Sequence, residues 1–131
     1  MEFQYTISPH SVYNINYHIV FCPKRRKSVL VDDIIPDLTE IVNRVCQKLN
    51  CEVKNLSILP NSVHLSVSAP PTISPHLIVK DIKGVAAHEL RPRYRILQKL
   101  PTMWSRSYYI CTIGQIDEQT IQDYIKKQNK A

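Results

Sequence analysis

Hydrophobic and polar residues follow two different periods along the first part of the chain. Between positions 13 and 21 apolar side chains occupy every second position, which predicts a strand with one buried face. Between positions 34 and 49 they recur three or four residues apart, which predicts an amphipathic helix. Asp32 and Asp33 are expected to cap this helix, and Asn50 is expected to end it.

Two further strands are predicted on either side of a turn at Pro60-Asn61. The first covers positions 52–59 and the second covers positions 62–68. In the second strand, apolar residues alternate with polar ones. Because successive side chains of a strand project to opposite faces, the polar residues are expected to share one face. These polar residues are Ser62, His64, Ser66 and Ser68.

The second half of the chain predicts a helix, an irregular segment, a strand and a final helix. A capping serine followed by proline begins the helix at 74–90. Gly84 lies inside this helix at a cost of up to ~1 kcal/mol, so a close neighbour is expected there, either another helix or a DNA backbone. An arginine-rich irregular segment is expected at 91–101, a strand at 105–113 and a last helix at 117–128.

The predicted order is strand, helix, strand, strand, helix, strand, helix. Its first six elements follow the split βαβ, ferredoxin-like pattern, in which one antiparallel sheet is formed. We therefore predict an α+β fold with an additional C-terminal helix. No internal repeat, linker or low-complexity tract interrupts the chain, so residues 1–131 are expected to form one domain.

Composition and charge narrow the possible functions. The formal net charge of +6 and the isoelectric point of about 9.2 suit a polyanionic partner, most often nucleic acid. Two glycines exclude a glycine-rich phosphate loop, and the four cysteines form no Cys-x-x-Cys pair that would indicate zinc. No segment approaches the ~20 apolar residues of a membrane span. The N-terminus has no signal-peptide pattern, so a cytoplasmic location is expected.

Four residues could form a catalytic centre. Ser62 and His64 share a strand face, and Tyr124 and Gln128 lie one turn apart on the predicted last helix. A divalent metal beside a phenol could polarise a phosphate while the phenol oxygen attacks it. Each residue also has an ordinary explanation, because His64 could be a surface histidine, Tyr124 a core-edge residue and Gln128 a solvated one.

The chain resembles the TnpA-type single-tyrosine transposases, which carry a His-hydrophobic-His (HUH) motif, and their REP-associated relatives. Leu-Pro-Asn-Ser-Val-His-Leu at 59–65 is similar to their Pro-Asp-His-hydrophobic-His-Leu motif, and Tyr124 to Gln128 matches their Tyr-x-x-x-Gln. Further similarity, in the same order along the chain, lies at 16–26, 80–84, 104–109 and 112–114.

The resemblance implies a mechanism and partners. In that family the two histidines and the glutamine bind Mg²⁺ or Mn²⁺, and the tyrosine attacks a DNA phosphate. Carried over by position, His64 and Gln128 are metal ligands and Tyr124 is the nucleophile. The family also implies hairpin or single-stranded DNA as substrate and a homodimer whose subunits share each site. The expected DNA-binding residues are Lys24, Arg25, Arg26, Lys27, Lys83, Arg91, Arg93 and Arg106.

Two departures from the family motif leave alternatives open. Ser62 stands at the position of the first histidine, and Asn61 at that of an acidic residue. In the helix at 74–90, Ala87-His88 also differs from the expected small-residue–arginine pair. Either the chain is a working transposase with a weakened metal site, or it binds hairpin DNA without cutting it. An RNA-binding ferredoxin-like module is a third reading, but the chain lacks the aromatic-basic sheet motif of such domains.

Overall fold

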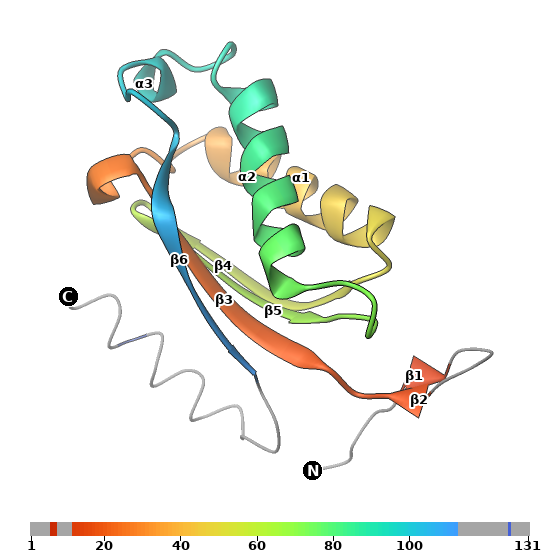
Figure 1. The fold of residues 1–131 in the computed structure, drawn as a ribbon. Helices are drawn as coiled ribbons and strands as arrows, with labels where there is room; N and C mark the ends of the chain where they lie inside the picture. Colours follow the sequence, from red (N-terminus) through yellow and green to blue (C-terminus); the bar gives the residue numbers. More distant parts are fainter. Residues whose placement is uncertain (1–5, 8–11, 113–125, 127–131) are drawn as a thin grey trace.

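The computed structural model describes residues 6–7, 12–112 and 126. A four-stranded antiparallel sheet, in the order β4-β5-β3-β6, carries the helices α1 and α2 on one face (Figure 1). A separate two-stranded ladder joins β1 to β2. The elements are β1 (Thr6–Ile7), β2 (Val12–Tyr13), β3 (Asn16–Pro23), η1 (Lys24–Arg26), α1 (Ile34–Lys48), β4 (Glu52–Leu59), β5 (Ser62–Ser68), α2 (Pro75–Leu90), α3 (Arg95–Gln98) and β6 (Trp104–Thr112).

The order of strands confirms the ferredoxin-like prediction. The four main strands alternate with α1 and α2 as the split βαβ pattern requires, and the first and third of them, β3 and β5, lie at the centre of the sheet. Of the last helix, predicted at 117–128, only Lys126 is described, and it is helical; the other residues of that range lie outside the described part of the chain. None of the helices in the described part of the chain is long and apolar enough to cross a membrane.

The hydrophobic core lies between the sheet and the two helices. On the sheet side it is built from alternate residues of the two central strands, because these residues point toward the helices. The helices contribute residues three and four positions apart. Fully buried core residues are Ile19, Phe21, Val63, Leu65 and Val67 from the sheet, Leu38, Ile41 and Val42 from α1, and Ile78, Ile82, Ala86 and Leu90 from α2.

The predicted positions of the helix ends agree with the structure, but the predicted capping of α1 by an aspartate side chain does not. Ser74 precedes α2, and its side chain accepts a hydrogen bond from the Leu77 backbone N–H at 3.1 Å. Asp33 occupies the N-cap position of α1 but makes no capping hydrogen bond with its side chain. Asn50 follows the last turn of α1 with a φ of 58°, a left-handed conformation that asparagine tolerates and that ends the helix.

Three predictions of local structure need correction. The strand predicted at 13–21 is divided, because β2 ends at Tyr13 and β3 begins at Asn16. The segment expected to be irregular contains the short helix α3, whose Leu97 is buried in the core. Gly84 was expected to have another helix or a DNA backbone as a close neighbour, but within the protein a Cβ at this position would meet no atom within 4 Å. A packed neighbouring helix is therefore not the reason for this glycine.

Candidate functional site

His64 and Ser62 lie on the face of β5 that points away from the two helices. Val63 and Leu65 point into the core, so the alternation of the strand directs Ser62 and His64 to the opposite face, as predicted. Both side chains are nevertheless buried, with 1% of His64 and 8% of Ser62 exposed. The Ser62 hydroxyl lies 3.1 Å from Nε2 of His64. His64 is thus not a surface histidine.

A second histidine, His18, lies beside His64 on the same face. In the antiparallel pairing of β3 and β5, Val20 is opposite His64 and His18 is opposite Ser66, which makes the two histidines diagonal neighbours. Their ring centroids are 6.0 Å apart with an angle of 31° between the ring planes. Nδ1 of His18 lies 3.2 Å from the Ser66 hydroxyl. Each histidine of the pair is therefore held by a serine on β5.

The pKa values of both imidazoles are lowered, which favours their neutral forms near neutral pH. Burial, reinforced by the nearby His18, lowers the pKa of His64 from 6.5 to about 4. Burial also lowers the pKa of His18. Within the described residues, Nδ1 of His64 is buried without a hydrogen-bond partner. A neutral imidazole with one nitrogen lacking a partner is the form in which histidine binds a metal ion.

The described residues do not by themselves make a metal centre. No group of three or more His, Cys, Asp or Glu residues that could hold a metal occurs among them. His64 fits such an ion as one nitrogen ligand. The other predicted ligand, Gln128, and the predicted nucleophile, Tyr124, lie outside the described residues.

A small polar pocket lies next to this histidine pair. It is lined by Val20, Cys22, Arg26, Asn61 and Ser62, and it has room for about one water molecule. The neighbouring turn η1 holds two successive arginines in left-handed backbone conformations, with φ of 58° at Arg25 and 52° at Arg26. Such conformations are costly for residues with side chains and often accompany functional sites. Here the turn brings a guanidinium to the pocket that contains Ser62.

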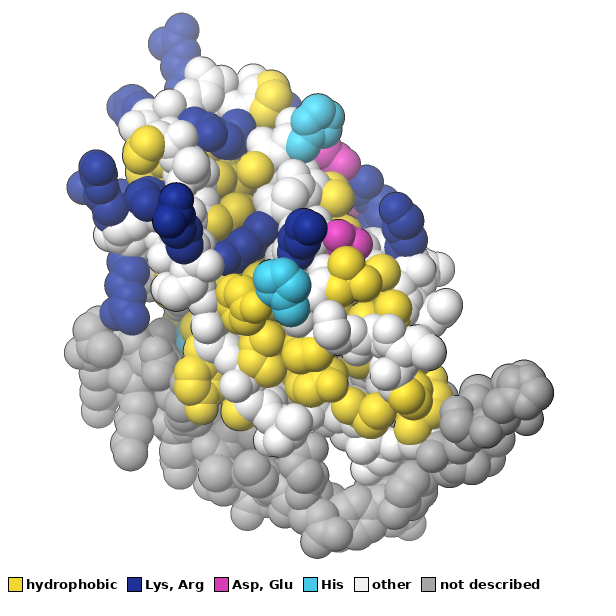
Figure 2. All heavy atoms as spheres, viewed as in Figure 1, with side chains coloured by type: hydrophobic (Ala, Val, Ile, Leu, Met, Phe, Trp, Pro, Cys, Tyr) yellow, Lys and Arg dark blue, Asp and Glu magenta, His cyan; other side chains and the backbone are white. Residues whose placement is uncertain are grey.

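The predicted basic loop is exposed. Arg25, Arg26 and Lys27 are open to solvent, and Lys24 is half-buried while its backbone N–H donates to the carbonyl of Met103 at 3.0 Å. Figure 2 shows lysine and arginine side chains gathered over the end of the molecule that carries α3, near η1. The exposed residues of this loop, together with Arg106 on β6, can therefore contact a phosphate backbone.

The other predicted DNA contacts have partners within the protein. Lys83 donates from Nζ to the Ser105 carbonyl at 2.8 Å and lies 5.4 Å from the ring centroid of Tyr108. Burial lowers the pKa of Lys83. Arg91 donates to the carbonyl of Leu100 at 2.6 Å. These bonds connect α2 to the segment and strand that follow it.

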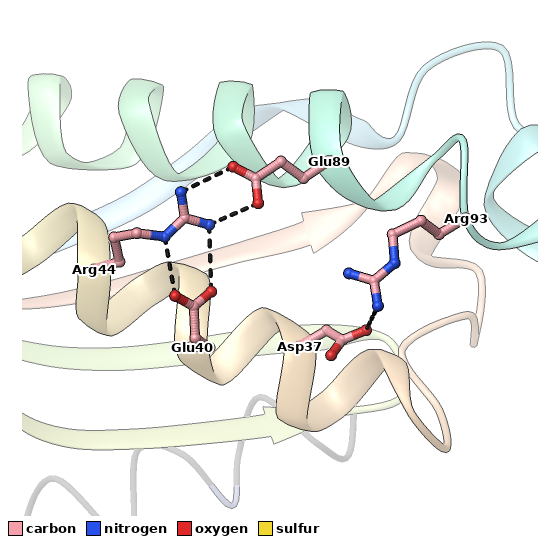
Figure 3. Close-up of polar contacts among 5 residues, drawn as sticks. All are labelled: Asp37, Glu40, Arg44, Glu89 and Arg93. Carbon is pink, nitrogen blue, oxygen red and sulfur yellow. Dashed lines mark hydrogen bonds and ion pairs between the residues drawn. The ribbon is translucent and has the colours of Figure 1, made fainter.

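Arg93 is also engaged. It forms an ion pair with Asp37 of α1 at 3.1 Å, as Figure 3 shows. A second ion-pair cluster in the same view joins the helices, because Arg44 of α1 binds Glu40 at 3.0 Å and Glu89 of α2 at 2.6 Å. Arg93 therefore has a structural role in addition to any contact with DNA.

Sequence reasoning missed His18. The first predicted strand has its apolar residues at odd-numbered positions, so His18 was expected on the opposite face of that strand. This alternation was the one signal in the sequence that could have marked His18 as a candidate site residue. Its proximity to His64 depends on the pairing of β3 with β5, which places His18 opposite Ser66, a residue 48 positions further along the chain. The pairing of two distant strands cannot be deduced from the alternation within either one.

The fold and this histidine-bearing sheet face define a ferredoxin-like protein with a polar centre beside a basic turn. The chain belongs to the family described as "Transposase IS200 like", which matches residues 11–128. It is similar to the ISDra2 transposase TnpA of Deinococcus radiodurans, with 32% identity over 90% of this chain and 86% of that protein. It is also 28% identical to the transposase for insertion sequence element IS200 of Salmonella typhimurium, over 91% of this chain and 80% of that one.

Solved structures agree in fold. A crystal structure of a Deinococcus radiodurans transposase superposes with a TM-score of 0.77 and 29% identity, covering 94% of this chain and 97% of that one. A REP-associated tyrosine transposase bound to a REP hairpin gives a TM-score of 0.62 at 15% identity, over 90% of this chain and 68% of that one. The latter likeness is one of fold.

Proposed function

We propose that this transposase-family chain binds single-stranded or hairpin DNA and cleaves and rejoins it through a covalent bond to Tyr124. The observation that carries the proposal is the buried His64, whose pKa burial lowers to about 4, beside a pocket that Arg26 and Ser62 line. Support also comes from the family match, which extends to residue 128 and so includes Tyr124 and Gln128.

Tyr124 is the proposed nucleophile. Its phenol oxygen attacks the phosphorus atom and loses its proton to solvent, and a new O–P bond joins the protein to the 5′ side of the break. The bond from phosphorus to the 3′ oxygen breaks, and this oxygen leaves as a hydroxyl after taking up a proton. A later attack by a 3′ hydroxyl on the phosphotyrosine restores a phosphodiester and frees the tyrosine. No oxidant or further reactant is consumed.

The chain's polar groups orient the phosphate. Arg26 places its charge at the pocket, where it can neutralise a phosphate oxygen, and Asn61 and Ser62 offer hydrogen-bonding groups beside it. His64 and Gln128 are the residues that would hold Mg²⁺ or Mn²⁺, with Ser62 binding through a water that the ion retains. Such an ion, when bound, would polarise the phosphate for attack.

A second candidate function is hairpin binding without cleavage. The observation that favours it is the hydrogen bond between Ser62 and His64, because a hydroxyl now occupies the place of the first imidazole of the family motif. A serine hydroxyl is a weaker ligand than an imidazole for most divalent metals. The two functions share the DNA-binding surface and differ only in the covalent step.

One experiment separates the two functions. A pool of 3′-end-labelled hairpin oligonucleotides with random single-stranded flanks is incubated with the full chain and Mn²⁺, then resolved on a denaturing gel. A cleaving enzyme transfers the label to the protein. Tyr124→Phe should abolish this transfer, whereas Tyr108→Phe, which changes an exposed tyrosine bonded to His76 at 2.5 Å, should preserve it. DNA retention without any covalent product would select the binding function.

We also propose a homodimer whose subunits share each site. The sheet has two edge strands, β4 and β6, which could pair with a second copy. At β6 the carbonyls of Ser105 and Ser107 already accept from Lys83, at 2.8 and 3.5 Å, which protects that part of the edge. Light scattering at micromolar concentration should give about twice the 15.2 kDa chain mass. A monomer at every concentration would exclude the dimer and the shared site.

A further inference from the structure

The segment between α2 and β6, which contains α3, is fixed by its own hydrogen bonds and by the core. The Arg91 guanidinium donates to the Leu100 carbonyl at 2.6 Å, which closes the segment on itself. The side-chain amide of Gln98 donates to the Arg91 carbonyl at 2.8 Å. Leu97 and Leu100 are buried in the core. α3 is therefore held in one orientation before any partner binds, which lowers the entropy cost of binding.

The outer side of α3 carries two positive charges and one apolar side chain. Successive residues of a helix are about 100° apart around its axis, so Arg95 and Lys99 point away from the side on which Leu97 is buried, and Ile96 lies next to them. Arg95 and Lys99 are exposed, and neither has an ion pair or a side-chain hydrogen bond among the described residues. Ile96 is 37% exposed. We call Arg95, Ile96 and Lys99 the α3 face.

The α3 face lies in a region of positive charge. No aspartate or glutamate occurs between Glu89 and Asp117 in the sequence. η1 adjoins the same region, because the Lys24 backbone N–H donates to the Met103 carbonyl at 3.0 Å, and Figure 2 shows lysine and arginine side chains over this end of the molecule. Such a region attracts a polyanion.

An apolar side chain beside two cations fits one part of a DNA hairpin. The side of a duplex presents mainly phosphates and the polar edges of bases. At the end of the stem, the apolar face of the last base pair is exposed between the phosphates of two strands. DNA-binding proteins insert isoleucine and similar side chains against base faces, whereas free single strands are held mainly by aromatic side chains. Ile96 therefore favours the end of a stem.

We propose that the α3 face binds the end of a hairpin stem, with Ile96 against the last base pair and with Arg95 and Lys99 on the phosphates beside it. The proposal rests on the proposed function for DNA as the ligand, and it adds the part of the hairpin that this surface recognises. Recognition is by shape, because base faces and phosphates are common to all sequences. It requires neither a metal ion nor the covalent step.

Ile96 is tested by fluorescence. A hairpin with random single-stranded flanks carries 2-aminopurine in the last base pair of its stem, and it is titrated with the full chain in EDTA. The wild-type chain should increase the emission, because an inserted side chain unstacks this base. Ile96→Ala, a change at an exposed position, should largely remove the increase at saturating protein. The same base placed in the middle of the stem is the control and should not respond.

Arg95 and Lys99 are tested by salt dependence with the same hairpin. Arg95→Gln combined with Lys99→Gln should make the slope of log affinity against log salt shallower by about 1.8, since each phosphate contact with duplex DNA contributes about 0.9. The matched control is Lys48→Gln combined with Lys54→Gln. It removes two exposed charges from α1 and from β4, the strand at the opposite edge of the sheet from β6, and should keep the wild-type slope.

The outcomes separate this inference from the proposed function. If the wild-type chain binds neither the hairpin nor its isolated single-stranded flank, both fail. If it binds the flank as tightly as the hairpin, or if Ile96→Ala gives the wild-type emission, only the recognition of the stem end is overturned. An equal change of slope in the Lys48 and Lys54 control would also overturn it, because total charge would then account for the binding.

Discussion

Ser62, which stands at the position of the first histidine in the motif that this chain resembles, is the residue at which the proposed function is tested most directly. In the structure Ser62 is buried and bonded to His64, so it is part of the polar face of the sheet. A histidine at this position would share that face with His64, since residues two apart on a strand point the same way.

Ser62→His should therefore tighten metal binding and increase the covalent attachment of DNA by about 10-fold or more, because a second imidazole on the strand adds a ligand. Adding Tyr124→Phe to this variant should remove the covalent product while DNA binding survives. The measurement is metal-dependent transfer of label from a hairpin oligonucleotide to the protein. Equal transfer by the wild-type chain and by Ser62→His would mean that the existing residues already provide the ligands.

The same histidines should make the protein sensitive to acid. The pKa of His64 is about 4 in the folded protein and 6.5 without burial, so between these values only the unfolded chain takes up the proton. Stability is then constant above about pH 6.5 and falls as the pH decreases toward 4. His18, whose pKa is also lowered, adds to the loss in the same direction.

For metal-free protein in EDTA, urea unfolding should show about 2 kcal/mol less stability at pH 5 than at pH 7.5 from His64 alone. His64→Gln should reduce this difference, and His76→Gln should leave it unchanged. If the wild-type chain and His64→Gln lose equal stability over this range, His64 does not control the acid response.

At the scale of the helices and strands, the sequence predicted most of the fold. Ser74-Pro75 specified the beginning of α2 because cap and proline act locally. The alternation along β5 predicted correctly which side chains face away from the core. It could not predict that these polar side chains are buried, because alternation distinguishes the two faces of a strand without showing whether the second face is covered. For the same reason His64 could not be distinguished from a surface histidine.

Gly84 gives a prediction for a single helix. Its position in α2 is exposed and an added Cβ would meet nothing within 4 Å, so alanine can be accommodated without a clash. Gly84→Ala should raise the free energy of unfolding by up to ~1 kcal/mol, since alanine restricts the unfolded chain more than glycine does. Thermal or urea unfolding would measure this. A decrease in stability would contradict the absence of neighbours, and a loss of DNA affinity in a more stable protein would place the DNA backbone against α2.

At the scale of the whole molecule, the net charge is +6, and the basic side chains of the described residues are of two kinds, those paired within the protein and those exposed without a partner. Arg44, Arg91 and Arg93 are held by acidic groups or carbonyls of the protein. Arg25 and Lys27 are exposed on the turn that leads to the pocket. The sequence alone predicted DNA contacts for Arg91 and Arg93 as well as for Arg25 and Lys27, because a cluster of charges in a sequence does not show which of them are already paired. Exposed and unpaired charges should dominate binding to DNA.

Binding of single-stranded DNA should therefore depend on salt through the turn at η1. If about five phosphates are contacted, the logarithm of the affinity should fall with the logarithm of salt concentration at a slope of about −3.5. Removing two exposed charges with Arg25→Gln and Lys27→Gln should make this slope shallower by about 1.4, since each contact with single-stranded DNA contributes about 0.7. Fluorescence anisotropy with a labelled hairpin oligonucleotide at several salt concentrations gives the slope.

Arg44→Gln is the matched control, because it removes one positive charge from a position that Glu40 and Glu89 already neutralise. The slope measured for this variant should equal that of the wild-type chain. An unchanged slope in the double variant, or an equal change in Arg44→Gln, would show that net charge rather than the exposed turn determines how the protein holds DNA.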